Sequence, residues 1–247
     1  MRIVVLNGWA ASPAAWSLCR SLCGNAAARV FSYVEQMDGE PERFMDLLDS
    51  RAVVVGWSMG GSGALRLALR CPEKIGALVL VAATPRMMEE RACASEELSN
   101  ADGCVWRGMS ERRLAALEAG LKMTKGAGFF GLPEGRPNPF MVDSEQNLAR
   151  GISYLRETDL RRRLVALAAS GRADFPVHVF QSLRDGIVRP ENAAFLARVF
   201  PQAVVEMVEG TEHALPVTIP ERIDEAILRA AGQTSFQTTD AGTSKEG

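Results

Sequence analysis

Histidine is scarce in this chain: among 247 residues there are two, His178 and His213. A histidine-rich metal centre is thereby excluded, and any reaction that needs an imidazole must use one of these two. No apolar run reaches the length of a membrane span, so a membrane-spanning helix is not expected. The net charge of −2 provides no general attraction for nucleic acid. We therefore expect no nucleic-acid partner and no membrane association.

Cysteine is also uninformative about structure, because the five residues are odd in number and scattered. We expect reduced thiols, no metal site and no cofactor. The N-terminus begins directly with a predicted strand, so we expect no signal peptide, and this favours a cytoplasmic location. The cysteines are Cys19, Cys23, Cys71, Cys93 and Cys104.

Short apolar runs alternate with helical patterns along much of the chain. This alternation predicts an α/β fold, with a mainly parallel sheet of about six strands covered by helices on both faces. Strands are expected at 3–6, 28–33, 52–56, 77–82, 177–181 and 204–208. Helices are expected at 13–22, 41–48, 60–70, 191–199 and 220–231.

One interval, 86–172, lacks strand patterns. Helical spacing at 110–123 and 143–167, with a Gly- and Pro-rich connector at 126–139, predicts a helical lid inserted into a core of 1–85 and 173–231. The polar segment 232–247 is expected to be disordered. The interval holds 12 Arg and 2 Lys against 9 Glu and 3 Asp, whereas the rest of the chain is net negative. Its charges indicate either a solvated helix face or a docking surface for an acidic partner.

The most specific motif is Gly56-Trp57-Ser58-Met59-Gly60, which fits G-x-S-x-G. An apolar strand pattern precedes it and a helical pattern follows. In that context the motif predicts a sharp turn, a nucleophile elbow, that presents Ser58 above the sheet. We therefore interpret Ser58 as a nucleophile, against the alternative of a chance match.

A serine nucleophile needs a base and an orienting carboxylate. His213 follows a predicted strand in a polar loop from which it can reach Ser58, whereas His178 lies inside a strand pattern and is interpreted as structural. Asp185 lies between serine and histidine in chain order, in a turn directly after a strand. Its rivals are Asp174, which precedes that strand, and Glu212, which adjoins the histidine.

An oxyanion would need two backbone donors. The N–H of Met59, directly after the nucleophile, is one candidate. The N–H of Trp9, in the loop Asn7-Gly8-Trp9 after the first strand, is the other. The ring of Trp9 is expected to be a core aromatic or to line an acyl pocket.

These motifs resemble those of the α/β-hydrolase superfamily over nearly the whole chain. More narrowly, the chain resembles the pimeloyl-[acyl-carrier protein] methyl ester esterases of biotin synthesis. The segment 154–161, Tyr-Leu-Arg-Glu-Thr-Asp-Leu-Arg, is the most specific part of this resemblance, with 7–9, 56–61, 185–188 and 213–214 beside it. The resemblance implies a serine esterase that removes the methyl group from the methyl ester of a pimeloyl group carried on acyl-carrier protein. It also implies contacts from lid arginines to the acidic carrier, for which Arg112, Arg156 and Arg161 are the candidates.

The chain departs from this family at two positions, and these differences leave the identity of the substrate open. Asn7 stands where the family usually has histidine, and Arg113 where it has an aromatic residue. A general carboxylesterase, a lactonase or a thioesterase of the same fold would share the same serine, histidine and aspartate. A non-catalytic binding module with this fold is the remaining alternative.

Overall fold

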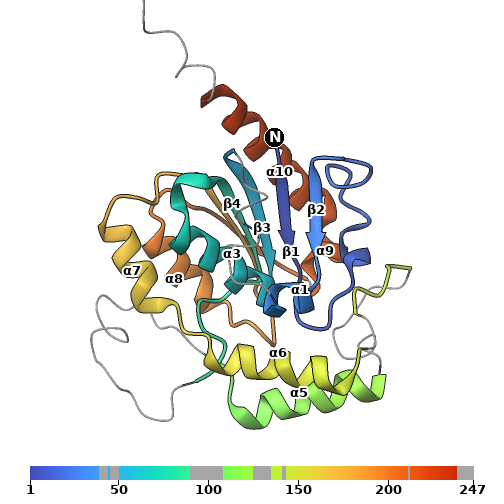
Figure 1. Cartoon of the computed structure of the whole chain (residues 1–247). Coiled ribbons are helices and arrows are strands. Elements are labelled where there is room, and N and C mark those ends of the chain that lie inside the picture. Colours follow the sequence, from blue (N-terminus) through green and yellow to red (C-terminus); the bar gives the residue numbers. More distant parts are fainter. Residues whose placement is uncertain are drawn as a thin grey trace, which may run out of the picture.

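The computed structural model describes residues 1–38, 44, 50–89, 108–124, 135–140, 143–210 and 212–237. Its centre is a sheet of six parallel strands in the order β2-β1-β3-β4-β5-β6 (Figure 1). This confirms the expected sheet, and the strand ends differ from the expected ones by one or two residues at most. The strands are β1 (Ile3–Leu6), β2 (Ala28–Phe31), β3 (Ala52–Trp57), β4 (Ile75–Val81), β5 (Val177–Ser182) and β6 (Val204–Val208).

Both faces of the sheet are covered, which explains why its central strands are apolar at every position. Val53 and Val55 of β3 face one core, whereas Val54 faces the other, as the two-residue period of a strand requires. The described helices are α1 (Tyr33–Asp38), α3 (Met59–Arg70), α5 (Glu111–Thr124), α6 (Glu145–Glu157), α7 (Arg161–Ala169), α8 (Glu191–Val199), α9 (Leu215–Thr218) and α10 (Pro220–Gln237), with the 3₁₀ turns η1 (Pro13–Trp16) and η2 (Pro72–Lys74).

The helices divide between the two faces. α3, α7 and α8 pack on the face of Val54, and α10 packs on the face of Val53 and Val55. Ile223 and Ile227 of α10 are fully buried there. Each buried isoleucine stabilises the fold by about 1.5–3 kcal/mol relative to an exposed one.

The order of the strands creates a crevice beside β1. From β1 the chain moves to β2 on one side, and then crosses to β3 on the other side. In parallel sheets, ligands bind at the carboxyl ends of the strands where this reversal occurs. The loops after β1 and β3 therefore meet at the position expected for a binding site.

Two helices of the interval 86–172 cross this edge of the sheet. Figure 1 shows α5 and α6 side by side beyond the carboxyl ends of β1 and β3. α6 is tied to the sheet layer at two points: the hydroxyl of Tyr33 donates to Asp143, just before α6, at 2.5 Å, and Trp9 Nε1 donates to the carbonyl of Leu148 at 3.2 Å. The space above the crevice is thereby bounded by helices.

Some expected helices are different. The helix expected at 13–22 is the short turn η1 followed by further turns, because its hydrogen bonds join residues three apart, as in Cys19 N to Trp16 O. The helix expected at 143–167 is divided into α6 and α7, because the chain between them turns to pair Leu160 N with Pro85 O. The expected helix at 41–48, apart from Phe44, and most of the connector at 126–139 lie outside the described residues.

Beyond these helices, the segment expected to be disordered is described only in part. α10 extends to Gln237, inside the segment expected to be disordered, and 238–247 lie outside the described residues. Within the described ranges, no helix is sufficiently long and apolar to cross a membrane.

Candidate active site

Ser58 occupies a strained turn between β3 and α3. Its backbone has φ 56° and ψ −118°, a region that residues with a side chain rarely adopt. Glycines make the turn possible, because a Cβ at Gly56 would lie 2.5 Å from the carbonyl oxygen of Gly60, and a Cβ at Gly60 would overlap the carbonyl of Leu6. The local sequence thus lets α3 begin directly against the strands, with Ser58 at its first turn.

The three predicted polar residues lie together. His213 Nε2 is 2.8 Å from Ser58 Oγ, and His213 Nδ1 is 2.8 Å from Asp185 Oδ2. All three are buried. Because a carboxylate only accepts hydrogen bonds, this arrangement favours the proton on Nδ1 and leaves Nε2 to accept from the serine hydroxyl. The geometry is that of a nucleophile, a base and an orienting acid.

Asp185 is itself fixed by its own loop. Its Oδ1 accepts from the backbone N–H of Ile187 at 2.8 Å and of Val188 at 2.9 Å. The turn predicted after β5 therefore forms a loop around the carboxylate. Oδ2 is left to face the histidine.

The two segments with the predicted oxyanion donors lie next to Ser58. Met59 is the first residue of α3, where backbone N–H groups have no partner within the helix. The loop after β1 approaches from the other side, since a Cβ at Gly8 would be 3.2 Å from the Cβ of Ser58. The positive end of the α3 dipole points to the same place.

Trp57 was not identified from the sequence as a site residue. It is fully buried, its Nε1 donates to the carbonyl of His213 at 3.1 Å, and its ring centroid is 5.8 Å from the imidazole. This contact fixes the loop that holds His213. The variable position in G-x-S-x-G offers no sequence signal for such a role.

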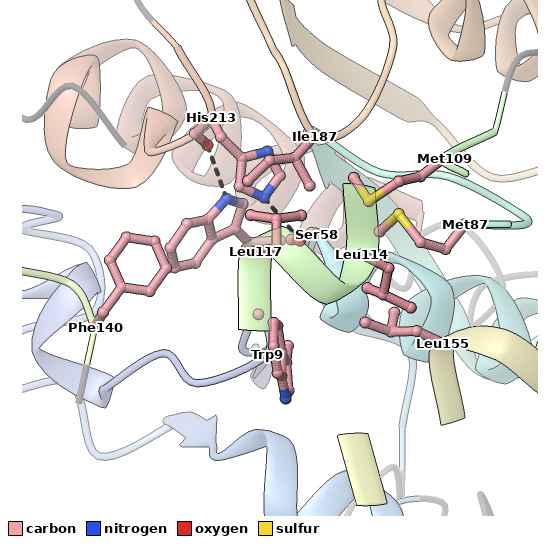
Figure 2. Close-up of a pocket in the computed structure, with 12 residues that line it drawn as sticks. Trp9, Ser58, Met87, Met109, Leu114, Leu117, Phe140, Leu155, Ile187 and His213 are labelled. Carbon is pink, nitrogen blue, oxygen red and sulfur yellow. Dashed lines mark hydrogen bonds between the residues drawn. The ribbon is translucent and has the colours of Figure 1, made fainter. Parts of the chain in front are cut away.

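A pocket of about 400 Å³, including its open mouth, lies above Ser58. Figure 2 shows side chains from the sheet loops and from α5 and α6 pointing into it. Apart from Ser58 and His213 its lining is apolar. The lining residues are Gly8, Trp9, Trp57, Ser58, Met87, Met109, Leu114, Leu117, Phe140, Leu155, Ile187 and His213. Such a pocket suits an uncharged, apolar chain.

His178 is remote from this pocket. It lies within β5, beside β6, and its Nδ1 is buried without a hydrogen-bond partner in the described part of the chain. Burial lowers the pKa of His178, and the nearby charge of Glu206 opposes that shift. These observations agree with the structural role expected for it.

The three candidate arginines differ in their surroundings. Arg112 is exposed on α5, and Arg156 on α6 is exposed but paired with Glu111 at 3.0 Å. Arg161 is only 6% exposed, and its guanidinium donates to both carboxylate oxygens of Asp159 at 2.8 and 3.0 Å. Arg161 is therefore the least suited of the three to contact a carrier, because its charged group is used within the fold.

The same pair explains the ionisation of Asp159. Burial alone would raise the pKa of this carboxyl. The hydrogen bonds from Arg161 and the charges of Arg161 and Arg86 outweigh burial, and the pKa is lowered. Arg86 binds Asp159 at 2.7 Å, so the segment after β4 is joined to the start of α7.

The ring of Trp9 packs directly against Gly151 of α6, because a Cβ at that position would overlap the indole. We expect Gly151→Ala to destabilise the protein by about 1–3 kcal/mol, the usual effect of overpacking. Gly232→Ala on α10 is the matched control, since in the described part of the chain nothing outside its own helix backbone lies within 4 Å of its Cβ position. It should stabilise by up to about 1 kcal/mol through helix propensity. Urea denaturation measures both, and equal stabilisation by the two variants would contradict the role of Gly151.

Known proteins are similar to this chain in sequence or in fold. The family described as alpha/beta hydrolase fold matches residues 3–100. A protein of Nitrosomonas europaea named pimeloyl-[acyl-carrier protein] methyl ester esterase is 39% identical over 95 residues, which span 34% of this chain and 37% of that protein. A Vibrio vulnificus protein of the same name is 26% identical over 258 residues, covering 94% of each chain.

Solved structures agree on the fold. An esterase from Exiguobacterium antarcticum superposes with a TM-score of 0.68 at 18% identity, covering 94% of this chain and 92% of that one. At such identity the likeness extends to the fold alone. Taken with the family match and the esterase-named relatives, these findings show that the chain is a hydrolase of the α/β-hydrolase superfamily.

Proposed function

We propose that this protein is a serine carboxylesterase that hydrolyses the methyl ester of a pimeloyl group carried on acyl-carrier protein, a step of biotin biosynthesis. The hydrogen-bonded set of Ser58, His213 and Asp185, opening into an apolar pocket, is the observation that most strongly supports it. The names of the relatives from Nitrosomonas europaea and Vibrio vulnificus support the choice of substrate.

In the first proposed step, His213 Nε2 takes the proton of the Ser58 hydroxyl while Oγ attacks the ester carbonyl. The backbone N–H groups of Met59 and Trp9 stabilise the oxyanion, and each such donor contributes about 3 kcal/mol to the transition state. Asp185 stabilises the imidazolium and holds its tautomer. Collapse of the intermediate breaks the bond to methoxide, which leaves as methanol with the proton from His213.

In the second step, His213 takes a proton from water, and the hydroxide attacks the acyl-serine. The bond to Ser58 Oγ breaks, the serine regains its proton from His213, and the free carboxylic acid is released. No cofactor is required for either step, because water and the ester supply all atoms.

The lining of the pocket supports a neutral ester as substrate. Burying an ionised carboxylate without a partner is strongly unfavourable, and the lining residues of this pocket besides Ser58 and His213 are apolar or glycine. A methyl-capped dicarboxylate presents an uncharged end to Ser58, whereas its hydrolysed product is anionic. Substrate entry and product release are therefore both favoured by the same apolar surface.

The docking of a carrier would use the helices above the site. We treat 86–172 as a lid on a core formed by 1–85 and 173–231. Arg112 on α5 is the leading candidate for contact with an acidic carrier, because it is exposed. Arg156 is a weaker candidate, since Glu111 already pairs with it.

Comparing carrier-bound and free methyl pimeloyl esters tests this proposal. We expect kcat/KM to be higher for the carrier-bound ester, and to fall about three- to tenfold on Arg112→Glu at low salt, because rim charges mainly change the association rate. The free ester should be unaffected by this substitution. Hydrolysis is measured by mass spectrometry of the carrier and by methanol release.

The matched control for this experiment is Arg70→Glu. Arg70 is the last residue of α3 and lies at the edge of the sheet opposite to Ser58. Its replacement by glutamate makes the same change of charge as Arg112→Glu. It should leave both substrates unchanged. Equal loss for the two variants, or indifference to the carrier in the wild type, would favour a general short-chain carboxylesterase, lactonase or thioesterase. Failure of a fluorophosphonate probe to label Ser58 would favour a binding module instead.

A further inference from the structure

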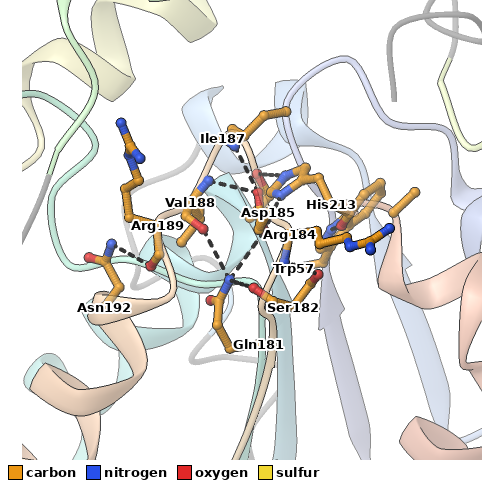
Figure 3. Close-up of polar contacts among 12 residues, drawn as sticks. Trp57, Gln181, Ser182, Arg184, Asp185, Ile187, Val188, Arg189, Asn192 and His213 are labelled. Atoms are coloured by element: carbon orange, nitrogen blue, oxygen red, sulfur yellow. Dashed lines mark hydrogen bonds and ion pairs between the residues drawn. The ribbon is translucent and has the colours of Figure 1, made fainter. Parts of the chain in front are cut away.

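Gln181 lies on β5, next to the last residue of the strand and just before the loop that contains Asp185. Its side chain is fully buried. Figure 3 shows its amide nitrogen among three oxygen atoms. Nε2 lies 3.0 Å from the carbonyl of Val188, 3.3 Å from the carbonyl of Ser182 and 3.3 Å from Asp185 Oδ2. All three oxygens only accept, so the amide must direct its N–H groups, and not its oxygen, to them.

The other end of the same amide is poorly placed. Gln181 Oε1 is buried without a hydrogen-bond partner in the described residues. A buried carbonyl without a partner destabilises a fold, and an apolar side chain of similar size would avoid that loss. An amide at this position is therefore best explained by what its nitrogen does.

That nitrogen acts on both oxygens of the carboxylate. It donates directly to Oδ2, the oxygen that also accepts from His213 Nδ1. It also fixes the carbonyl of Val188, whose own N–H donates to Oδ1. Gln181 thus adds a side-chain contact to the two backbone N–H groups, of Ile187 and Val188, that already hold Asp185.

We propose that Gln181 is a positioning residue of the esterase, which holds Asp185 in the orientation that keeps His213 directed at Ser58. It acts through Asp185 and touches neither substrate nor the reacting atoms. This inference rests on the proposed catalytic roles of Ser58, His213 and Asp185. It adds a residue that G-x-S-x-G and the chain order of the three do not predict.

Gln181→Met tests the proposal, because methionine keeps the length of the side chain and removes the donor. We expect kcat on a short-chain chromogenic ester to fall about ten- to a hundredfold, the effect of losing a hydrogen bond to a charged group. KM should stay within about threefold of the wild type, because the pocket lining is unchanged. The melting temperature is measured in parallel.

Gln202→Met is the matched control. The Nε2 of Gln202 also donates to two backbone carbonyls, those of Ala173 at 2.7 Å and Phe175 at 2.9 Å, but it has no contact with Asp185. A purely structural role predicts that both variants lose stability and keep kcat. The proposal predicts a loss of kcat in Gln181→Met alone.

Gln181→Glu provides a readout that packing would not change. A second carboxylate beside Asp185 favours the protonated, inactive imidazole, so the acid limb of kcat/KM against pH should move to higher pH. Arg113, Arg184 and Arg189 are exposed around this loop and the same in all variants. If both Gln181 variants keep the kcat and the pH profile of the wild type, this inference is overturned and the proposed function is not. A wild type that neither hydrolyses esters nor reacts with a fluorophosphonate overturns the proposed function as well.

Discussion

Ser58→Ala should reduce ester hydrolysis by about 10⁴-fold or more, because the acyl-enzyme can no longer form and only binding and the oxyanion donors remain. The variant should fold, since the hydroxyl accounts for a single hydrogen bond, to His213 Nε2. Turnover of a chromogenic ester and labelling by a fluorophosphonate probe measure the loss. Circular dichroism checks the fold.

Ser62→Ala is the control for loss of a buried hydroxyl. Ser62 lies one turn further along α3, and its Oγ donates to the carbonyl of Thr84 at 2.8 Å. Its replacement should cost about 1 kcal/mol of stability and leave turnover within a few-fold. If Ser58→Ala keeps more than a few per cent of wild-type turnover, Ser58 is not the nucleophile.

The strained turn at Ser58 adds a second measurement on the same position. A positive φ costs a residue with a side chain about 1–3 kcal/mol, whereas glycine adopts it freely. Ser58→Gly should therefore be more stable than Ser58→Ala, although both lack the nucleophile. Functional sites typically contain strained positions of this kind, which lower the stability of the protein but present a side chain for the reaction.

The polar centre of the site was predictable from sequence because its residues belong to short local patterns. Ser58 follows an apolar strand, Asp185 follows another, and His213 is the one histidine in a loop. Parallel strands end at the same edge of a sheet, so three such loops must approach one another. Their catalytic roles are still a prediction, which the variants above would test.

The supporting residues could not be predicted, because their roles depend on contacts between distant segments. Trp57 and His213 are far apart in the chain, as are Trp9 and Leu148. Gln181 reads as one more polar position near the end of a strand. Arg161 also shows that the sequence does not reveal such contacts. It resembles a lid arginine in sequence, but its side chain is buried against Asp159.

Asp185→Asn should lower kcat/KM by about 10⁴-fold although the two side chains have the same shape. The reason lies in the loop. Two backbone N–H groups, from Ile187 and Val188, point at the Oδ1 position, so the asparagine oxygen must occupy it. Its NH₂ group then takes the Oδ2 position and faces His213 Nδ1 and Gln181 Nε2.

A donor facing Nδ1 reverses the histidine tautomer. The imidazole can accept that hydrogen bond only if its proton moves to Nε2, and a protonated Nε2 cannot take the proton from Ser58. Asp174→Asn is the control, since Asp174 is exposed, precedes β5 and forms an ion pair with Arg51 at 3.5 Å. It should keep activity within twofold. Steady-state kinetics of the two variants decide between the carboxylates, and comparable losses would rule out Asp185 as the residue that orients the base.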